Sequence, residues 1–215
     1  MRNFDAFIFD IDGTLTSTNE LIFASFNHVA EKYLNKKFTN EEIISLFGPS
    51  EEVILKSWMK DYFEEAKKDY YNFYSSKHSE MVDVYPGIIE VIRLIKSKGL
   101  PLAIFTGKGK KTTEITLKFI EVDQYFDMII TSDDVKEHKP SPEGINKFID
   151  HFNLQRSRVL MIGDSPADIL ASKKAGIKIA SVVWDSYAKD EVLSMDSDYI
   201  FYTVDELKEF VKKNI

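Results

Sequence analysis

The amino-acid sequence predicts an α/β fold in which a doubly wound, mainly parallel sheet carries an all-helical insert. From residue 85 onwards, short apolar runs alternate with amphipathic segments, the pattern of repeated strand–helix units. A separate apolar run at residues 4–9 precedes them. Between residues 18 and 84 the apolar side chains instead follow helical spacing. A chain of 215 residues is long enough for one domain with such an insert.

The N-terminal elements follow from local spacing. The run at residues 4–9 is typical of a buried strand, and it stops at Asp10. Residues 21–34 place apolar side chains one helical turn apart, which predicts a helix. Thr39 followed three residues later by Glu42 predicts a capping box at the start of the next helix. A break is expected at residues 48–50. Another helix is expected at residues 61–77.

The later elements alternate between the two types. A helix over residues 88–98 is predicted to end at Gly99, since glycine is favoured just past a helix C-terminus. The predicted strands lie at residues 102–105, 128–131, 159–162, 179–183 and 199–201. The predicted helices between and after them lie at residues 110–120, 142–152, 166–175 and 204–212.

The helical block interrupts the sheet rather than following it. It leaves from the end of the first strand, and the other strands come after it. We therefore expect a core of residues 1–17 and 85–215 and a cap of residues 18–84 over the carboxyl edge of the sheet.

Composition excludes several classes of function. The formal net charge is −7, from 28 basic and 35 acidic residues, so neither nucleic acid nor an anionic membrane is an expected partner. There are no cysteines, which removes disulfides and thiolate chemistry. No apolar run approaches the ~20 residues of a membrane helix, and the first residues contain no signal-peptide pattern. We expect a cytoplasmic monomer.

Candidate chemical groups follow the predicted strands. Asp10 follows the first strand, Thr106 the second and Asp164 the fourth, and Lys139 lies in the loop after the third. Ligands of open α/β sheets bind outside the carboxyl ends of the strands. The sequence therefore predicts one site containing two acids, a hydroxyl and a lysine.

This set suits phosphoryl transfer. A carboxylate such as Asp10 attacks a phosphoryl group that a metal has made electrophilic, and Mg²⁺ prefers oxygen ligands. Asp164 and a backbone carbonyl near Asp12 are further candidate ligands, which leaves the Asp12 side chain to protonate the leaving group and then activate water. Thr106 and Lys139 are candidate donors to the phosphoryl oxygens.

Each motif also has a purely structural interpretation. Asp12-Gly13 is typical of a turn, and Lys139 before two prolines is typical of a solvated helix lead-in. Asp164 or Ser165 is a natural cap of the following helix, and Asp168 complements the dipole of that helix. Their order on consecutive strand ends favours the catalytic interpretation.

Four segments resemble the motifs of the haloacid dehalogenase-like hydrolase superfamily: FDIDGTLT, FTGKGKKT, HKPSPEG and GDSPAD. The resemblance implies a Rossmann-like core with a helical cap inserted after the first motif. It also implies a phosphatase with its nucleophile at Asp10, its acid/base at Asp12, phosphate contacts from Thr106 and Lys139, Mg²⁺ on Asp10, Asp12 and Asp164, and a supporting role for Asp168.

Within the superfamily, the chain is most similar to the pyrophosphatase and phosphoglycolate phosphatase branch, on the segments TNELI and FGPS. The expected substrate is a small phosphorylated metabolite or pyrophosphate. Gly13, the backbone N–H of Gly107 and the side chain of Lys108 are further expected contacts. Lys108, Lys110 and Lys111 also suit a solvated helix start, and that helix N-terminus favours anions.

Two alternatives remain. A phosphomutase of the β-phosphoglucomutase type needs a cation in the cap, and Glu51 stands about where relatives carry one. The other alternative is a catalytically inactive regulatory binding protein. Such a protein would not need the four charges of Asp10, Asp12, Lys139 and Asp164, whose removal from water costs free energy. An aromatic cluster between residues 62 and 74 suits core packing better than a substrate wall.

Overall fold

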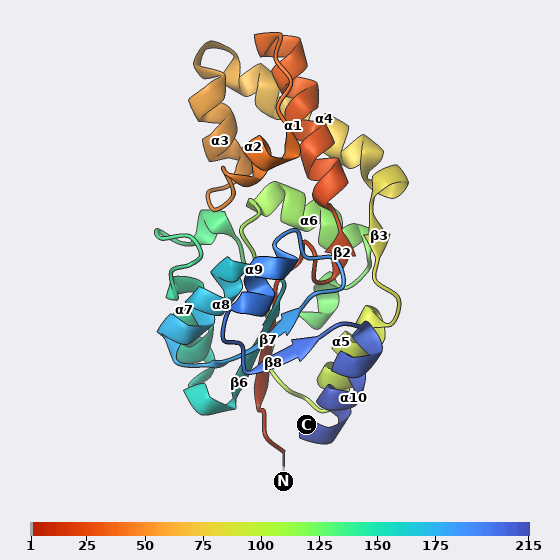
Figure 1. Cartoon of the computed structure of the whole chain (residues 1–215), viewed down its shortest axis with the longest axis vertical. Coiled ribbons are helices and arrows are strands. Elements are labelled where there is room, and N and C mark those ends of the chain that lie inside the picture. Colours follow the sequence, from red (N-terminus) through yellow and green to blue (C-terminus); the bar gives the residue numbers. More distant parts are fainter. Residues whose placement is uncertain (1) are drawn as a thin grey trace.

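The computed structural model describes residues 2–215, which form a parallel sheet beneath a group of helices (Figure 1). The six-stranded sheet has the order β5-β4-β1-β6-β7-β8, and every neighbouring pair in it is parallel. The chain therefore builds outwards from β1 in one direction and then in the other, the doubly wound arrangement that the sequence predicts. The strands are β1 (Ala6–Phe9), β4 (Leu102–Phe105), β5 (Met128–Ile130), β6 (Val159–Gly163), β7 (Lys178–Val182) and β8 (Tyr199–Phe201).

Helices cover both faces of the sheet. Alternate side chains of β1 point to opposite faces, so that Phe7 and Phe9 enter one apolar cluster while Ala6 and Ile8 enter the other. The first cluster includes residues of α5 (Ile88–Ser97), α6 (Lys110–Phe119) and α10 (Val204–Asn214). The second includes residues of α7 (Glu143–Phe152), α8 (Pro166–Ala175) and α9 (Lys189–Ser194). Short 3₁₀ turns lie at Asp123–Tyr125, Ser132–Asp134 and Arg156–Arg158.

The cap has an apolar core of its own. The predicted capping box is confirmed, because Thr39 Oγ1 accepts a hydrogen bond from Glu42 N at 3.2 Å and Glu42 Oε2 accepts one from Thr39 N at 2.7 Å. Tyr70 and Tyr74 are fully buried, as core packing requires. The cap helices are α1 (Asn19–Leu34), α2 (Asn40–Ile44), α3 (Glu51–Trp58) and α4 (Phe63–Met81), with a 3₁₀ turn at Lys60–Tyr62.

Two features were not predicted from the sequence. The chain crosses between core and cap through β2 (Thr16–Ser17) and β3 (Asp83–Val84), which pair antiparallel beside α6 (Figure 1). A two-residue strand is too short to show alternation, so no periodicity reveals it. Helix α9, of six residues, was not predicted either. No helix among residues 2–215 has the length and apolar character to cross a membrane. The division into core and cap at residues 17/18 and 84/85 stays a prediction.

Candidate active site

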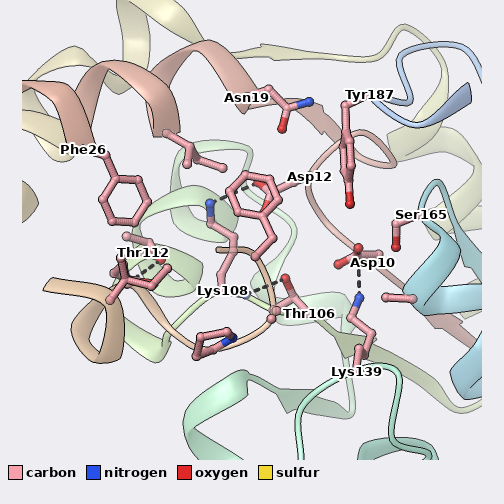
Figure 2. Close-up of a pocket in the computed structure, with 18 of the residues that line it drawn as sticks. Asp10, Asp12, Asn19, Phe26, Thr106, Lys108, Thr112, Lys139, Ser165 and Tyr187 are labelled. Atoms are coloured by element: carbon pink, nitrogen blue, oxygen red, sulfur yellow. Dashed lines mark hydrogen bonds and ion pairs between the residues drawn. The ribbon is translucent and has the colours of Figure 1, made fainter. Parts of the chain in front are cut away.

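Lys139 links two acids at the carboxyl edge of the sheet. Its Nζ lies 3.0 Å from Asp10 Oδ2 and 2.7 Å from Asp168 Oδ1, and it donates to the Phe105 carbonyl at 3.2 Å. Figure 2 shows the ion pair with Asp10 at the base of the pocket. Lys139 is buried, so the interpretation of this residue as a solvated helix lead-in is wrong. The loop after β5 folds inwards, because two carboxylates and a carbonyl compensate the ammonium there.

Three buried carboxylates gather around this lysine. Asp10, Asp164 and Asp168 each present an oxygen within 4.8 Å of the others. Asp164 Oδ2 is buried and has no hydrogen-bond partner among residues 2–215. A Cβ at Gly13, whose φ is +71°, would lie 2.3 Å from that oxygen, so the turn after β1 needs glycine both for its backbone and for Asp164. An unpartnered carboxylate oxygen among hard oxygen donors fits a divalent cation such as Mg²⁺.

Burial is the main cause of the raised pKa values of Asp10 and Asp164. It raises the pKa of Asp10 to about 7, against the opposing attraction of Lys139. It also raises the pKa of Asp164 well above its ordinary value, and the neighbouring Asp10 and Asp168 add to this. Burial by itself lowers the pKa of Lys139, but Asp10 and Asp168 outweigh it and raise that pKa. The lysine therefore stays charged, and a bound cation would favour the ionised carboxylates.

Asp12 points away from the three carboxylates and towards the cap. Its Oδ1 accepts hydrogen bonds from Lys108 Nζ at 3.0 Å and from the Thr18 hydroxyl. Its side chain is therefore not part of the carboxylate cluster. The resemblance implies Mg²⁺ on Asp10, Asp12 and Asp164, and for Asp12 the candidate ligand is a backbone carbonyl near it rather than its side chain.

Lys108 is buried rather than solvated, contrary to one of the two interpretations of its lysine cluster. Besides Asp12, its ammonium lies 4.9 Å from the centre of the Tyr74 ring, which belongs to the cap. Lys110 and Lys111, in the first turn of α6, are exposed as that interpretation expects. Asp12 and the ring together compensate a cation that could otherwise not be buried.

Thr106 sits at the end of β4. Its N–H donates to the Ile130 carbonyl at 3.0 Å, which continues the ladder with β5, and its buried hydroxyl accepts from Lys108 N at 3.2 Å. The hydroxyl and the adjacent Gly107 line the same pocket as Asp10. The structure therefore brings Asp10, Asp12, Thr106, Gly107, Lys108, Lys139 and Asp164 to one pocket, with Gly13 and Asp168 against Asp164 and Lys139.

The pocket lies between core and cap and has a volume of about 150 Å³. An apolar cavity of roughly this size admits a benzene-sized molecule in other proteins. The cap side chains that line the pocket are largely apolar or aromatic, among them Ile22, Phe26, Ile54 and Tyr70. Figure 2 shows Phe26 across the pocket from Asp10. The space suits one compact ligand whose reacting end faces the sheet edge.

The lining residues that were not among the predicted site residues include Asn19, Glu51, Tyr70 and Tyr187. Tyr187 follows β7, so the strand-end rule could have pointed to it. Asn19 begins the helix directly after the first motif. Tyr70 belongs to the aromatic cluster between residues 62 and 74; it packs in the cap core, as expected, and also lines the pocket. Glu51 carries no such local signal, since only the placement of the cap on the core brings it to the pocket.

Comparison with known proteins agrees with this geometry. The family model described as haloacid dehalogenase-like hydrolase matches residues 7–182. The chain belongs to this family. The resemblance inferred from the four motifs is thereby confirmed, and a haloacid dehalogenase-like hydrolase is an enzyme.

Relatives of this hydrolase cover nearly its whole length. It is 34% identical to the pyrophosphatase PpaX of Halalkalibacterium halodurans over 204 residues, 95% of each chain. It is 33% identical to the pyrophosphatase PpaX of a Bacillus cereus strain over 201 residues, 90% of this chain and 93% of the relative. The crystal structure of CbbY from Rhodobacter sphaeroides, in complex with phosphate, superposes with a TM-score of 0.81 at 22% identity, covering 95% and 96% of the two chains, and shows the same fold.

Proposed function

We propose that the chain is a Mg²⁺-dependent phosphatase that hydrolyses small phosphate esters or anhydrides, such as pyrophosphate or phosphoglycolate, through an aspartyl-phosphate at Asp10. The broader statement, that it is a hydrolase of the phosphatase type, follows from its family and its pyrophosphatase relatives. The carrying observation is the buried Asp10, 3.0 Å from Lys139, beside Asp164 with its unpartnered oxygen. From its composition, we also propose that it acts in the cytoplasm.

In the proposed first step, a carboxylate oxygen of Asp10 bonds to phosphorus as the bond from phosphorus to the leaving oxygen breaks. Asp12 gives that oxygen its proton. In the second step a water loses its proton to Asp12 and attacks the same phosphorus, which releases phosphate and restores Asp10. One acid thus serves both steps.

The remaining residues hold the charges in place. Lys139 and Thr106 would donate to the phosphoryl oxygens, where negative charge accumulates. Asp168 accepts from Lys139 at 2.7 Å and so fixes its direction. Asp10, Asp164 and a backbone carbonyl near Asp12 would hold Mg²⁺, which makes the phosphoryl group electrophilic when bound.

The cap supports a compact substrate and not a phosphomutase. Among residues 2–215, those of the cap that line the pocket include no lysine, arginine or histidine. The lining cations are Lys108 and Lys139, both on the core. A sugar bisphosphate that must turn over in the site would find no cap cation for its distal phosphate.

A phosphate-release assay tests the proposal. Wild-type protein is assayed with pyrophosphate, 2-phosphoglycolate, glucose phosphates and nucleoside monophosphates, with Mg²⁺ and with EDTA. We expect Mg²⁺-dependent release with the highest kcat/KM for the two compact substrates. Glucose phosphates or nucleotides exceeding both by about tenfold would contradict the substrate assignment.

The variant Asp10→Asn tests the nucleophile in the same assay, because an amide does not attack phosphorus. We expect turnover to vanish while the circular dichroism spectrum stays that of the wild type. Removal of a catalytic nucleophile lowers activity far below a few per cent of wild type. Residual activity above roughly a few per cent would therefore exclude Asp10 from that role.

A further inference from the structure

Glu51 reaches from the cap into the core. It is the first residue of α3 and only 6% exposed. Its Oε2 accepts a hydrogen bond from Gly109 N at 2.8 Å, and its Oε1 accepts one from Thr112 Oγ1 at 2.9 Å. Gly109 is the N-cap residue of α6 and has no side chain with which to cap that helix. The cap thus supplies the acceptor for the Gly109 N–H, while Asp133 of the core accepts from the next amide, Lys110 N, at 2.7 Å.

Gly109 is shaped to receive this carboxylate. Its φ of −71° and ψ of 164° are extended values that any residue adopts, so the backbone does not require glycine here. A Cβ at this position would lie 2.8 Å from Glu51 Oε1 and 2.9 Å from Oε2. The absent side chain is therefore space for Glu51, and the two residues complement each other across the boundary between core and cap.

The contact also decides what the start of α6 can bind. Free N–H groups and the helix dipole favour an anion there. This helix start, predicted to favour anions, already holds two of the chain's own carboxylates: Glu51 at Gly109 N and Asp133 at Lys110 N. Burial raises the pKa of Glu51, while Gly109 N–H and Lys108 act in the opposite direction, towards the charged form.

We propose that Glu51 is a positioning residue that latches the cap onto α6 and, in doing so, restricts the closed site to substrates with one compact group beyond the reacting phosphate. In the view of Figure 1, α3 lies on the side of the cap away from β3, so the latch joins the two parts on the side opposite the chain connections. The substrate restriction rests on the proposed phosphatase function. The latch itself does not.

Two variants and one control test the latch by hydrogen exchange at the amides of residues 107–113. Glu51→Ala removes the carboxylate. Gly109→Ala leaves Glu51 intact but puts a methyl group where its oxygens lie. The control is Glu52→Ala, since among residues 2–215 the neighbouring Glu52 bonds only with Tyr71 and Lys67 of the cap. We expect exchange to rise about tenfold or more in both test variants, equivalent to about 1.4 kcal/mol of opening, and to stay unchanged in the control.

Kinetics of the same proteins test the restriction. With Mg²⁺, we expect Glu51→Ala to raise the KM for pyrophosphate about tenfold. We expect kcat/KM for a hexose bisphosphate to fall much less or to rise, because the Gly109 N–H becomes free for its second phosphate. Equal loss on both substrates would reduce Glu51 to a structural residue and overturn the restriction. Unchanged exchange in both variants would overturn the latch. Absence of Mg²⁺-dependent phosphate release in wild type would refute the proposed function, while the exchange experiment would still decide the latch.

Discussion

At the scale of single residues, the site depends on buried charges that compensate one another. Lys139 is held by Asp10, Asp168 and a carbonyl, and Lys108 by Asp12 and an aromatic ring. Removing water from an isolated charge costs several kcal/mol. Each cation can therefore be buried only because its partners lie beside it and offset that cost. Removing one partner should therefore affect stability as well as chemistry.

Asp168→Ala should lower the free energy of unfolding by about 3 kcal/mol, because it leaves buried Lys139 with one carboxylate fewer and removes the N3 acceptor of the α8 capping box. Urea unfolding without metal measures this. Asp205→Ala, an exposed first-turn acid of α10, is the matched control and should change stability by less than about 0.5 kcal/mol. A loss below about 1 kcal/mol for Asp168→Ala would mean that Asp10 alone suffices for Lys139.

Asp12→Asn should slow the attack on poor leaving groups more than on good ones. A leaving group such as p-nitrophenol needs little protonation, whereas an alkyl alcohol needs a full proton transfer worth roughly 10²–10⁴ in rate. Single-turnover kinetics with p-nitrophenyl phosphate and an alkyl phosphate give the comparison. Equal slowing of the two substrates would argue against Asp12 as the acid.

At the scale of elements, the long cap helix α4 is anchored on the core helix α6 through one threonine. Tyr74 Oη and His78 Nε2 lie 2.9 and 3.0 Å from Thr116 Oγ1, and the His78 ring packs against Phe119 at 4.5 Å between centroids. Burial lowers the pKa of His78 to about 4, and Lys108 adds to the effect. The packing of α4 on α6 therefore requires a neutral imidazole.

This packing should weaken in acid. The unfolded chain takes up the proton of His78 near its ordinary pKa of about 6.5, and the folded chain only near about 4, so the stabilisation is complete above about pH 6.5 and is lost as the pH falls to about 4. The loss is at most about 3 kcal/mol. Urea unfolding of wild type and His78→Gln between these pH values should show a difference that shrinks in acid. The control His151→Gln, at an exposed position of α7, should track wild type. Parallel curves for wild type and His78→Gln would contradict the prediction.

At the scale of the whole molecule, an acidic chain with a formal charge of −7 gathers Asp10, Asp164 and Asp168 at one buried edge. Their mutual repulsion is a cost of the fold in the absence of a cation. A cation that binds only the folded chain stabilises it by mass action.

Mg²⁺ should therefore raise the melting temperature. At a concentration about 100 times its dissociation constant the gain is about 2.7 kcal/mol, or roughly 5–10 °C for a chain of this length, and EDTA should reverse it. Asp164→Asn should abolish most of the shift, while Asp196→Asn, whose side chain is 97% exposed, should keep it. An unchanged shift in Asp164→Asn, measured by calorimetry, would exclude Asp164 as a ligand of the cation.

The sequence alone determined the sheet and the edge at which the site lies. Strand and helix periodicities are local, and parallel strands necessarily bring their carboxyl ends together, so the placement of Asp10, Thr106, Lys139 and Asp164 followed from their positions after apolar runs. The helical cap followed in the same way, from spacing within each segment.

Only the tertiary structure decided how the cap meets this edge. The contacts of Lys108 with Asp12 and Tyr74, and of Glu51 with Gly109, join segments far apart in the chain. Whether a lysine is solvated or buried, and whether a helix start is open or filled, depends on the free energy of bringing two folded parts together. Charge pairs and shape complementarity between core and cap determine that free energy, and the periodicity within either segment does not predict it.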